Sequence, residues 1–281
     1  MKIAVTGASG FLGSRIADRL QAEGHEVLRL THAAADIADI VALRKALTGF
    51  GTQAVVHSAA IADIGECEKN RDKAERVNIT GTRNVARVTA EADAALVFVS
   101  SDQVYDYRSG KILDESVEPS PLNYYGYTKT EGEKETAKLF RHYIARIAWQ
   151  YDYRNGGSGL WGLAERAVRG QAVLKYAVNG RRSVNYVEDT VDVIAAMVKE
   201  TLPYGVYNVA SPNDMTEEET YRLALYKAGA DESTIKRALI EKSSEPFDLR
   251  AVPANLMRAG YVMPDVAEGL TRCASDKANG R

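Results

Sequence analysis

The stretch N-Y-Y-G-Y-T-K at residues 123–129 places three tyrosines directly before a lysine. Tyr125 stands four residues before Lys129, so in a helix the two side chains lie one turn apart on the same face. Tyr124 and Tyr127 are less well placed beside the lysine. An ammonium within about 4–6 Å favours a phenolate, so we expect Lys129 to lower the pKa of Tyr125 from about 10 by about two or three pH units. Such a phenol can exchange a proton with a carbonyl oxygen during hydride transfer.

A second hydroxyl is expected near this pair. The sequence V-S-S-D-Q-V-Y occupies residues 99–105 and follows a predicted strand at 95–100. Ser100 and Ser101 then lie at the carboxyl end of a strand, where open α/β sheets form their active-site crevice. A serine in this position often only caps a turn. The neighbouring Tyr–Lys motif favours the catalytic interpretation, in which a serine hydroxyl holds the substrate oxygen.

A glycine-rich turn begins the chain. Residues 6–13 read T-G-A-S-G-F-L-G, with the spacing G-x-x-G-x-x-G, between a predicted strand at 2–6 and a predicted helix at 11–23. Glycines allow a tight turn and let the main chain approach a pyrophosphate, whose charge suits a helix N-terminus. A turn without a ligand is the alternative. The strand–turn–helix context favours a dinucleotide site.

The end of the second predicted strand bears on the cofactor. The strand Glu26–Leu30 is followed by Thr31 and His32, where dinucleotide sites usually hold an acidic residue for the ribose. An acid would repel a 2′-phosphate, so its absence favours NADP(H), with NAD(H) as the alternative. Arg29, His32 and Arg15 are candidate phosphate partners, although each one alone is better explained as a solvated surface side chain.

Short apolar runs alternate with longer amphipathic stretches through the first 150 residues. Strands are expected at 2–6, 26–30, 54–57, 95–100 and 142–148, and helices at 11–23, 40–47, 72–91 and 124–140. This alternation predicts an α/β fold with a doubly wound parallel sheet, Rossmann-like in topology.

The pattern changes after residue 148. Residues 151–159 form a Gly-rich loop, followed by predicted helices at 160–170, 186–199 and 217–228 and strands at 173–177 and 205–209. We therefore expect residues 1–150 to form an NAD(P)-binding domain and residues 151–281 a smaller α+β substrate-binding lobe, interleaved with the first.

Composition excludes several classes of protein. The 281 residues are 45% hydrophobic and 26% charged, with a net charge of −2, which favours neither a nucleic acid nor an anionic membrane as partner. Cys67 and Cys273 lack metal-ligand or disulfide spacing. No segment approaches the roughly 20 apolar residues of a transmembrane helix, and M-K-I-A-V-T-G runs directly into a strand, so no signal peptide is expected. We expect a cytoplasmic protein without a metal site.

Together these motifs resemble the extended short-chain dehydrogenase/reductases. They are T-G-A-S-G-F-L-G, H-S-A-A at 57–60, S-S-D-Q-V-Y and N-Y-Y-G-Y-T-K-T-E-G-E. The chain is most similar to the dTDP-4-dehydrorhamnose reductase branch, whose members carry S-T-D-x-V-F after the fourth strand and Y-G-x-T-K-x-x-G-E on the following helix. R-S-V-N-Y-V-E-D at 182–189 and G-V-Y-N-V-A at 205–210 match patterns common in the substrate lobe.

The resemblance implies a role for individual residues. Tyr125 would be the catalytic acid/base, Lys129 its partner on the nicotinamide ribose, and Ser101 the substrate-holding hydroxyl; Asp102 and Arg182 would contact substrate. The glycines would cradle the pyrophosphate, and an asparagine would brace the site. The implied cofactor-binding residues are Gly7, Ser9, Gly10, Phe11, Leu12, Gly13, Thr31, His32, Asp36, Ile37, Ser58, Ala59, Ala60, Asn78, Tyr125 and Lys129.

The substrate lobe holds fewer signals. Arginine offers phosphate a forked, bidentate partner, and Arg182 is a better candidate than Arg154, Arg181 or Lys175; any of the four could equally be a surface charge. Tyr151 and Tyr153 could stack on a base or pack within the loop. Three features depart from the family. Glu245 followed by Pro246 stands where an arginine–proline pair is usual, and the residues after Trp149 differ from the usual W-V-Y-G. Ser101 replaces the family's threonine, which keeps the hydroxyl.

These observations predict an NADPH-dependent reductase of a 4-keto-6-deoxy sugar nucleotide. The alternatives are an epimerase or dehydratase with tightly bound NAD, and a non-catalytic regulatory subunit that binds the cofactor. Members of the family often dimerise through the helix that carries the Tyr–Lys pair, which leaves a homodimer open.

Overall fold

The computed structural model describes residues 1–154, 157–242 and 246–280. The chain forms two compact units. Unit 1 consists of Met1–Asp106, Glu118–Arg146 and Val191–Tyr207, and unit 2 of Tyr107–Val117, Ile147–Thr190 and Asn208–Arg281. The chain therefore passes between the units several times. The expected division near residue 150 stays a prediction.

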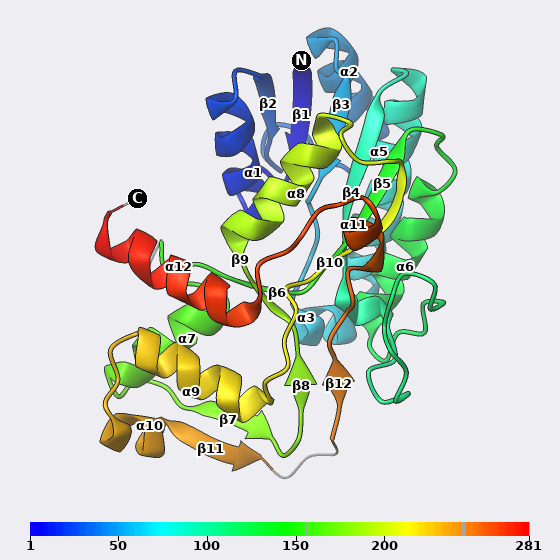
Figure 1. The fold of residues 1–281 in the computed structure, drawn as a ribbon. Coiled ribbons are helices and arrows are strands. Elements are labelled where there is room, and N and C mark those ends of the chain that lie inside the picture. The colour runs from blue at the N-terminus through cyan, green and yellow to red at the C-terminus, as the bar shows by residue number, and fades with distance from the viewer. Residues whose placement is uncertain (155–156, 243–245, 281) are drawn as a thin grey trace. The chain divides into compact units, whose positions relative to one another are not determined.

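Unit 1 is built on a six-stranded sheet of order β10-β5-β4-β3-β1-β2 (Figure 1). The pairs β1–β2, β1–β3 and β3–β4 are parallel. The order reverses between β1 and β3, as in doubly wound folds, so the predicted fold class is confirmed. The strands of the sheet are β1 (Lys2–Thr6), β2 (Glu26–Leu30), β3 (Ala54–His57), β4 (Ala95–Ser101), β5 (His142–Ile147) and β10 (Gly205–Val209).

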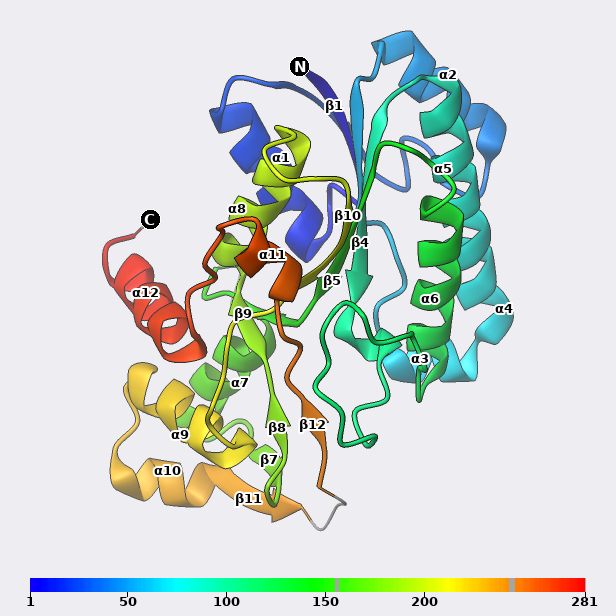
Figure 2. The same ribbon diagram turned by 45° about the vertical axis from the view of Figure 1, so that its right-hand side comes forward.

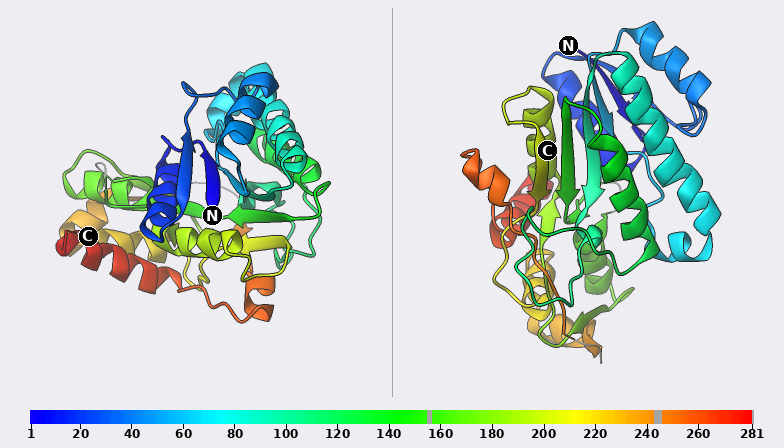
Figure 3. Two further views of the ribbon diagram at one scale, coloured as in Figure 1. Left: turned by 90° about the horizontal axis from the view of Figure 1, so that it is seen from above. Right: turned by 90° about the vertical axis from the view of Figure 1, so that its right-hand side faces the viewer.

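Helices cover both faces of this sheet. Helices α2, α5 and α6 lie side by side on one face, and α1 and α8 on the other, as Figures 2 and 3 show. Every residue of β3 and β4 is buried, as expected for strands covered on both sides. The helical segments are α1 (Phe11–Ala22), α2 (Ile40–Phe50), α3 (Ile64–Lys69), α4 (Arg71–Ala74), η1 (Glu75–Thr80), α5 (Gly81–Glu91), η2 (Asp102–Val104), α6 (Tyr124–Thr136) and α8 (Val187–Val198).

The helix predicted at 72–91 is not continuous. It divides into α4, the π-helical segment η1 and α5. The apolar pattern is compatible with one helix, and sequence gives no signal for the wider turn. The helix predicted at 124–140 ends at Thr136.

Unit 2 contains three two-stranded sheets, β11–β7, β12–β8 and β6–β9, all with parallel pairing. Helix α12 packs against α9 and β9. The strands are β6 (Trp149–Tyr151), β7 (Leu174–Ala177), β8 (Arg181–Arg182), β9 (Val184–Tyr186), β11 (Leu239–Lys242) and β12 (Asp248–Leu249); the helices are α7 (Gly159–Val168), α9 (Glu217–Lys227), α10 (Glu232–Ala238), α11 (Ala254–Arg258) and α12 (Val266–Ala278).

Within the described ranges, none of the helices is both long and apolar enough to span a bilayer. Nor do the described residues bring together three His, Cys, Asp or Glu side chains in a way that could hold a metal ion.

Candidate active site

The turn between β1 and α1 requires its glycines. Gly7 adopts φ +67°, and a Cβ there would lie 2.8 Å from the backbone nitrogen of Ala59. A Cβ on Gly13 would overlap the Gly7 carbonyl and lie 2.7 Å from Ser58 Oγ. The Gly10 N–H donates to Gly7 O at 2.8 Å and closes the turn. Helix α1 therefore begins directly against the ends of β1 and β3.

The N-terminus of α1 carries no side-chain cap. In the described chain Gly10 occupies the N-cap position without a capping hydrogen bond, and the first turn contains no acidic residue. Its leading N–H groups and the helix dipole can therefore serve an anionic ligand. Of the other predicted turn residues, Ser9 is exposed, Phe11 partly buried and Leu12 buried.

The segment after β2 holds the predicted adenine-side residues. Thr31 is partly buried and His32 is exposed, with Nδ1 4.0 Å from Asp36. Asp36 accepts a hydrogen bond from the Ala38 N–H at 2.9 Å and pairs with Arg76 at 2.6 Å. The Ala38 bond, more than the arginine, lowers the pKa of the Asp36 carboxyl.

Two further side chains define this region. Ile37 is buried, and its carbonyl accepts a hydrogen bond from Asn84 at 3.0 Å. Arg29, a candidate phosphate partner, donates instead to Asp18 and Gln21, at 2.6 Å each. To bind a phosphate through this nitrogen, Nη2, Arg29 would have to break its hydrogen bonds with Asp18 and Gln21.

A buried histidine links the carboxyl ends of β1 and β3 to α5. The Thr6 hydroxyl accepts from the Ala59 N–H at 3.3 Å and contacts His57 Nδ1 at 2.7 Å. Thr82 donates to the Asn78 carbonyl at 2.6 Å, so it accepts from His57 Nε2 at 2.9 Å. The proton of the neutral ring therefore lies on Nε2. Burial and, less strongly, the nearby ammonium of Lys129 on α6 lower the pKa of His57 to about 3.

Asn78 joins two parts of the site, as the resemblance implied. Its side chain accepts from the Ile61 N–H at 2.8 Å and donates to the Ile61 carbonyl at 2.9 Å and to Thr128 at 3.0 Å. Asn78 lies in η1, and π-helical turns recur at functional sites. It ties the loop after β3, which carries Ala59 and the partly buried Ala60, to helix α6.

Helix α6 approaches the end of β4 closely because of two glycines. A Cβ on Gly126 would lie 2.9 Å from the carbonyl carbon of Gln103, and one on Gly132 would lie 2.6 Å from the Phe98 ring. The Asn123 side chain caps the helix by accepting from the Gly126 N–H at 2.8 Å. Both glycines therefore serve the packing of α6.

The predicted catalytic residues lie on these two elements of unit 1, with Ser101 at the end of β4 and Tyr125 and Lys129 on α6. Tyr125 lies close enough to Ser101 for their hydroxyls to interact, and this interaction acts to lower the pKa of Tyr125. The Ser101 hydroxyl also lies 3.2 Å from Asp102 Oδ1 and accepts from the Gln103 N–H at 3.2 Å. Lys129 is 3% exposed, and its Nζ lies 4.5 Å from the centre of the Phe98 ring.

The expected acidification of Tyr125 by Lys129 is wrong for this arrangement. Burial raises the pKa of Tyr125 well above its ordinary value, and the Asp102 carboxylate raises it further. The hydrogen bond with Ser101 opposes this rise, while Lys129 makes no resolved contribution. Burial also lowers the pKa of Lys129 to about 8. One-turn spacing fixes the helix face, but packing decides which neighbours govern the phenol.

Unit 2 places Arg182 among aromatic rings. Its guanidinium carbon lies 5.4 Å from the ring centre of Trp149 and 5.6 Å from that of Phe247. Its Nε lies 3.8 Å from the Glu217 carboxylate. Glu217 is buried and accepts hydrogen bonds from the Ala177 N–H and the Tyr221 hydroxyl, at 2.9 and 2.7 Å.

The other substrate-lobe candidates are engaged differently. Arg154 pairs with Asp152 and Glu188, so two carboxylates already surround it. Arg181 donates to the Asp214 carbonyl. Lys175 is exposed and Tyr153 is partly buried. Tyr151 is fully buried and its ring stacks on that of Tyr186, which favours a packing role over stacking on a substrate. Glu245 lies outside the described residues.

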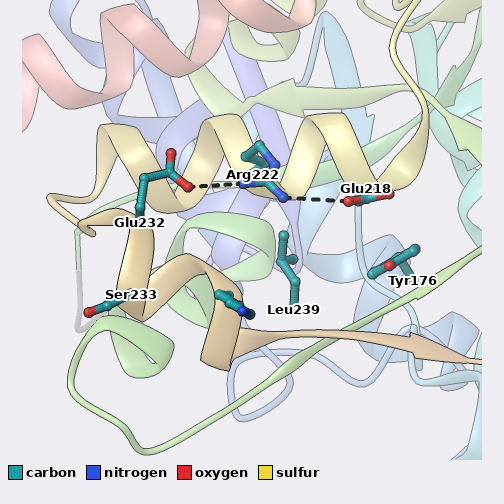
Figure 4. A pocket seen from close by; sticks show the side chains of 7 residues that line it. Tyr176, Glu218, Arg222, Glu232, Ser233 and Leu239 are labelled. Atoms are coloured by element: carbon teal, nitrogen blue, oxygen red, sulfur yellow. Dashed lines mark hydrogen bonds and ion pairs between the residues drawn. The ribbon is translucent and has the colours of Figure 1, made fainter.

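A hollow of about 570 Å³ lies elsewhere in unit 2, beside α9 and α10 (Figure 4). Arg222 spans it with partners on both sides, Glu218 and Glu232. The remaining lining residues are Tyr176, Ser233, Lys236 and Leu239. None of the residues predicted from the sequence for catalysis, cofactor or substrate lines this hollow.

Fold and site together define the class of the protein, which is an NAD(P)-dependent oxidoreductase with a Rossmann-like sheet. The chain belongs to the family described as the RmlD substrate binding domain, whose family model matches residues 1–263. The resemblance drawn from the sequence motifs is thereby confirmed.

Individual relatives carry matching names. A dTDP-4-dehydrorhamnose reductase of Mycolicibacterium smegmatis is 29% identical over 250 residues, covering 87% of this chain and 75% of the relative. A dTDP-4-keto-6-deoxy-D-glucose reductase of Streptomyces niveus is 29% identical over 272 residues, covering 92% and 85%. The crystal structure of dTDP-4-dehydrorhamnose reductase from Bacillus anthracis in complex with NADP is 25% identical, with a TM-score of 0.88 and coverage of 98% and 99%.

Proposed function

We propose that the protein is an NADPH-dependent reductase of a 4-keto-6-deoxy sugar nucleotide. The observation that carries the proposal is that Tyr125 of α6 interacts with Ser101 at the end of β4, while Lys129 of the same helix lies over the Phe98 ring of that strand. The names of the relatives, reductases of dTDP-linked keto sugars, support the substrate class.

In this mechanism Tyr125 gives its proton to the substrate carbonyl oxygen, while the Ser101 hydroxyl holds that oxygen. The raised pKa keeps the phenol protonated at neutral pH, which is the form that a proton donor needs in the reductive direction. Lys129 would hold the nicotinamide ribose. Bound NADPH supplies the hydride.

The glycine turn and the N-terminus of α1 would hold the pyrophosphate, and the segment carrying Asp36 and Ile37 the adenosine. NADP(H) is the proposed cofactor. The absence of an acid at Thr31 and His32 supports it, as does the NADP complex of the Bacillus anthracis relative. Unit 1 would therefore supply both the cofactor site and the proton donor.

The function is tested with purified protein, NADPH and a dTDP-linked 4-keto-6-deoxy sugar. We expect loss of NADPH absorbance together with formation of the 4-hydroxy sugar, and a higher kcat/KM with NADPH than with NADH. Tight NADPH binding without oxidation across several keto-sugar nucleotides would favour a regulatory subunit. Stoichiometric NAD in the purified protein would favour an epimerase or dehydratase.

Arg182 is proposed to bind the diphosphate of the substrate. A guanidinium can meet phosphate oxygens with two parallel hydrogen bonds, and the Trp149 and Phe247 rings hold it in place. The Glu217 carboxylate, 3.8 Å from Arg182 Nε, also helps to orient it.

Replacing Arg182 by lysine keeps the charge and removes the fork. Since hydrogen bonds to charged groups contribute about 1.5–3 kcal/mol, we expect KM for the sugar nucleotide to rise about 10- to 100-fold with little change in kcat. Steady-state kinetics and inhibition by dTDP measure this. Arg181→Lys on the same strand is the control, and an unchanged KM in Arg182→Lys would exclude the role.

A further inference from the structure

A buried carboxylate on α6 joins the elements that carry the catalytic residues. The Glu133 carboxylate accepts a hydrogen bond from the Ser100 hydroxyl at 2.6 Å. It also accepts three hydrogen bonds from the Arg146 guanidinium, one from Nη2 at 2.8 Å and two from Nε at 3.0 and 3.2 Å. Arg146 also donates to the Tyr105 hydroxyl at 2.8 Å. Ser100 lies on β4 and Arg146 on β5, so one side chain of α6 is bonded to two neighbouring strands.

The position of Glu133 relates it to the reacting groups. It follows Lys129 by one helical turn, and its partner Ser100 directly precedes Ser101 in β4. Glu133 is 6% exposed and Arg146 4%, so water screens neither charge effectively. A shift of α6 along β4 would break these bonds and separate Ser101 from Tyr125 at the same time.

Glu133 also provides the main negative charge near Lys129. Burial lowers the pKa of Lys129, and Glu133 and, less strongly, Cys67 on α3 raise it, which leaves the pKa at about 8. From β4 the ammonium meets the neutral Phe98 ring, and from β3 the uncharged His57. Tyr125, on α6 itself, stays protonated. Lys129 therefore depends on Glu133 more than on its other neighbours to remain an ammonium.

We propose that Glu133 is a positioning residue, which holds α6 in register with β4 and β5 and keeps Lys129 in its ammonium form. The kinetic part of this inference rests on the proposed reductase function. The charge state of Lys129 does not, because it can be measured without turnover.

The test is Glu133→Gln, which preserves size and removes the charge. We expect kcat to fall by up to about 10²-fold, the scale associated with a misplacement of about 1 Å. The alkaline limb of the pH–kcat profile should move to lower pH, because the amine loses the charge that favours its protonated form. Nitrogen NMR titration of the Lys129 amine, assigned with Lys129→Met, should show its midpoint moving the same way.

Glu133→Gln leaves Arg146 buried without its charged partner, which can prevent folding. The double variant Glu133→Gln with Arg146→Gln removes both charges and keeps two groups that can hydrogen bond. It should fold and still show the lowered Lys129 midpoint. Glu131→Gln is the control on the same helix, since that carboxylate pairs with the exposed Lys134.

An unchanged Lys129 midpoint in folded Glu133→Gln, or in the double variant compared with Arg146→Gln alone, would overturn the proposal. A wild-type protein that never oxidises NADPH would instead refute the proposed function, while the NMR titration would still decide the role of Glu133.

Discussion

Replacing Tyr125 by phenylalanine is expected to lower kcat by about 10²–10⁴-fold, the usual contribution of a positioned acid. The hydroxyl that interacts with Ser101 disappears, while the aromatic ring remains. The change therefore removes the proton and leaves the packing. Single-turnover oxidation of NADPH by the keto sugar nucleotide measures the loss directly, because product release does not enter.

Tyr127→Phe is the matched control for this change. Tyr127 lies two residues further along α6, and its side chain is exposed. Its replacement by phenylalanine removes the same hydroxyl oxygen from a different face of the helix. We expect it to retain wild-type turnover, and NADPH affinity to stay close to normal in both variants. Near-normal turnover in Tyr125→Phe would mean that the proton comes from another group, and the proposed mechanism would fail.

Much of unit 1 could be predicted from the sequence because its signals are local. The apolar runs that became β1 to β5 are bounded by turns, and the glycine turn combines strand, loop and helix within a dozen residues. The Tyr125–Lys129 spacing follows from helix geometry alone. The glycines at 126 and 132 were harder to interpret, since their purpose is the close approach of α6 to Gln103 and Phe98.

The remainder depends on partners that are distant in sequence. Ser100, Glu133 and Arg146 meet only after three elements have packed, and the link from Thr6 through His57 to Thr82 spans β1, β3 and α5. The pKa of Tyr125 was predicted with the wrong sign for the same reason. The sequence contains the cation one turn away, but not the burial or the Asp102 carboxylate that outweigh it.

Unit 2 shows the same limit more strongly. Its short strands pair across long separations, as when Leu174 lies opposite Leu239 and Arg181 opposite Asp248. Strands of two to four residues give almost no periodic signal. The aromatic environment of Arg182 likewise depends on two residues that are distant in sequence. Trp149 precedes Arg182 and Phe247 follows it, each by more than 30 residues.

Replacing Gly13 by alanine is expected to weaken NADPH binding by about 10²-fold. The added Cβ would overlap the carbonyl of Gly7, with its carbon 2.8 Å away, and would lie 2.7 Å from Ser58 Oγ. Gly7 cannot turn aside easily, because its carbonyl accepts the Gly10 N–H and its own Cα faces the backbone of Ala59. Helix α1 must therefore move outward with its N-terminal N–H groups, and a shift of about 1 Å has a cost of this order.

Fluorescence titration with NADPH measures the loss, and thermal unfolding shows whether the fold survives, since overpacking costs about 1–3 kcal/mol. Gly49→Ala is the control: it makes the same change within α2, where the added Cβ meets no heavy atom of another described element within 4 Å. That variant should bind NADPH normally and be at least as stable as the wild type, because alanine favours the helix by about 0.5–1 kcal/mol. If folded Gly13→Ala bound NADPH with wild-type affinity, the pyrophosphate could not lie against this turn. The cofactor site would then have to be sought away from the N-terminus of α1.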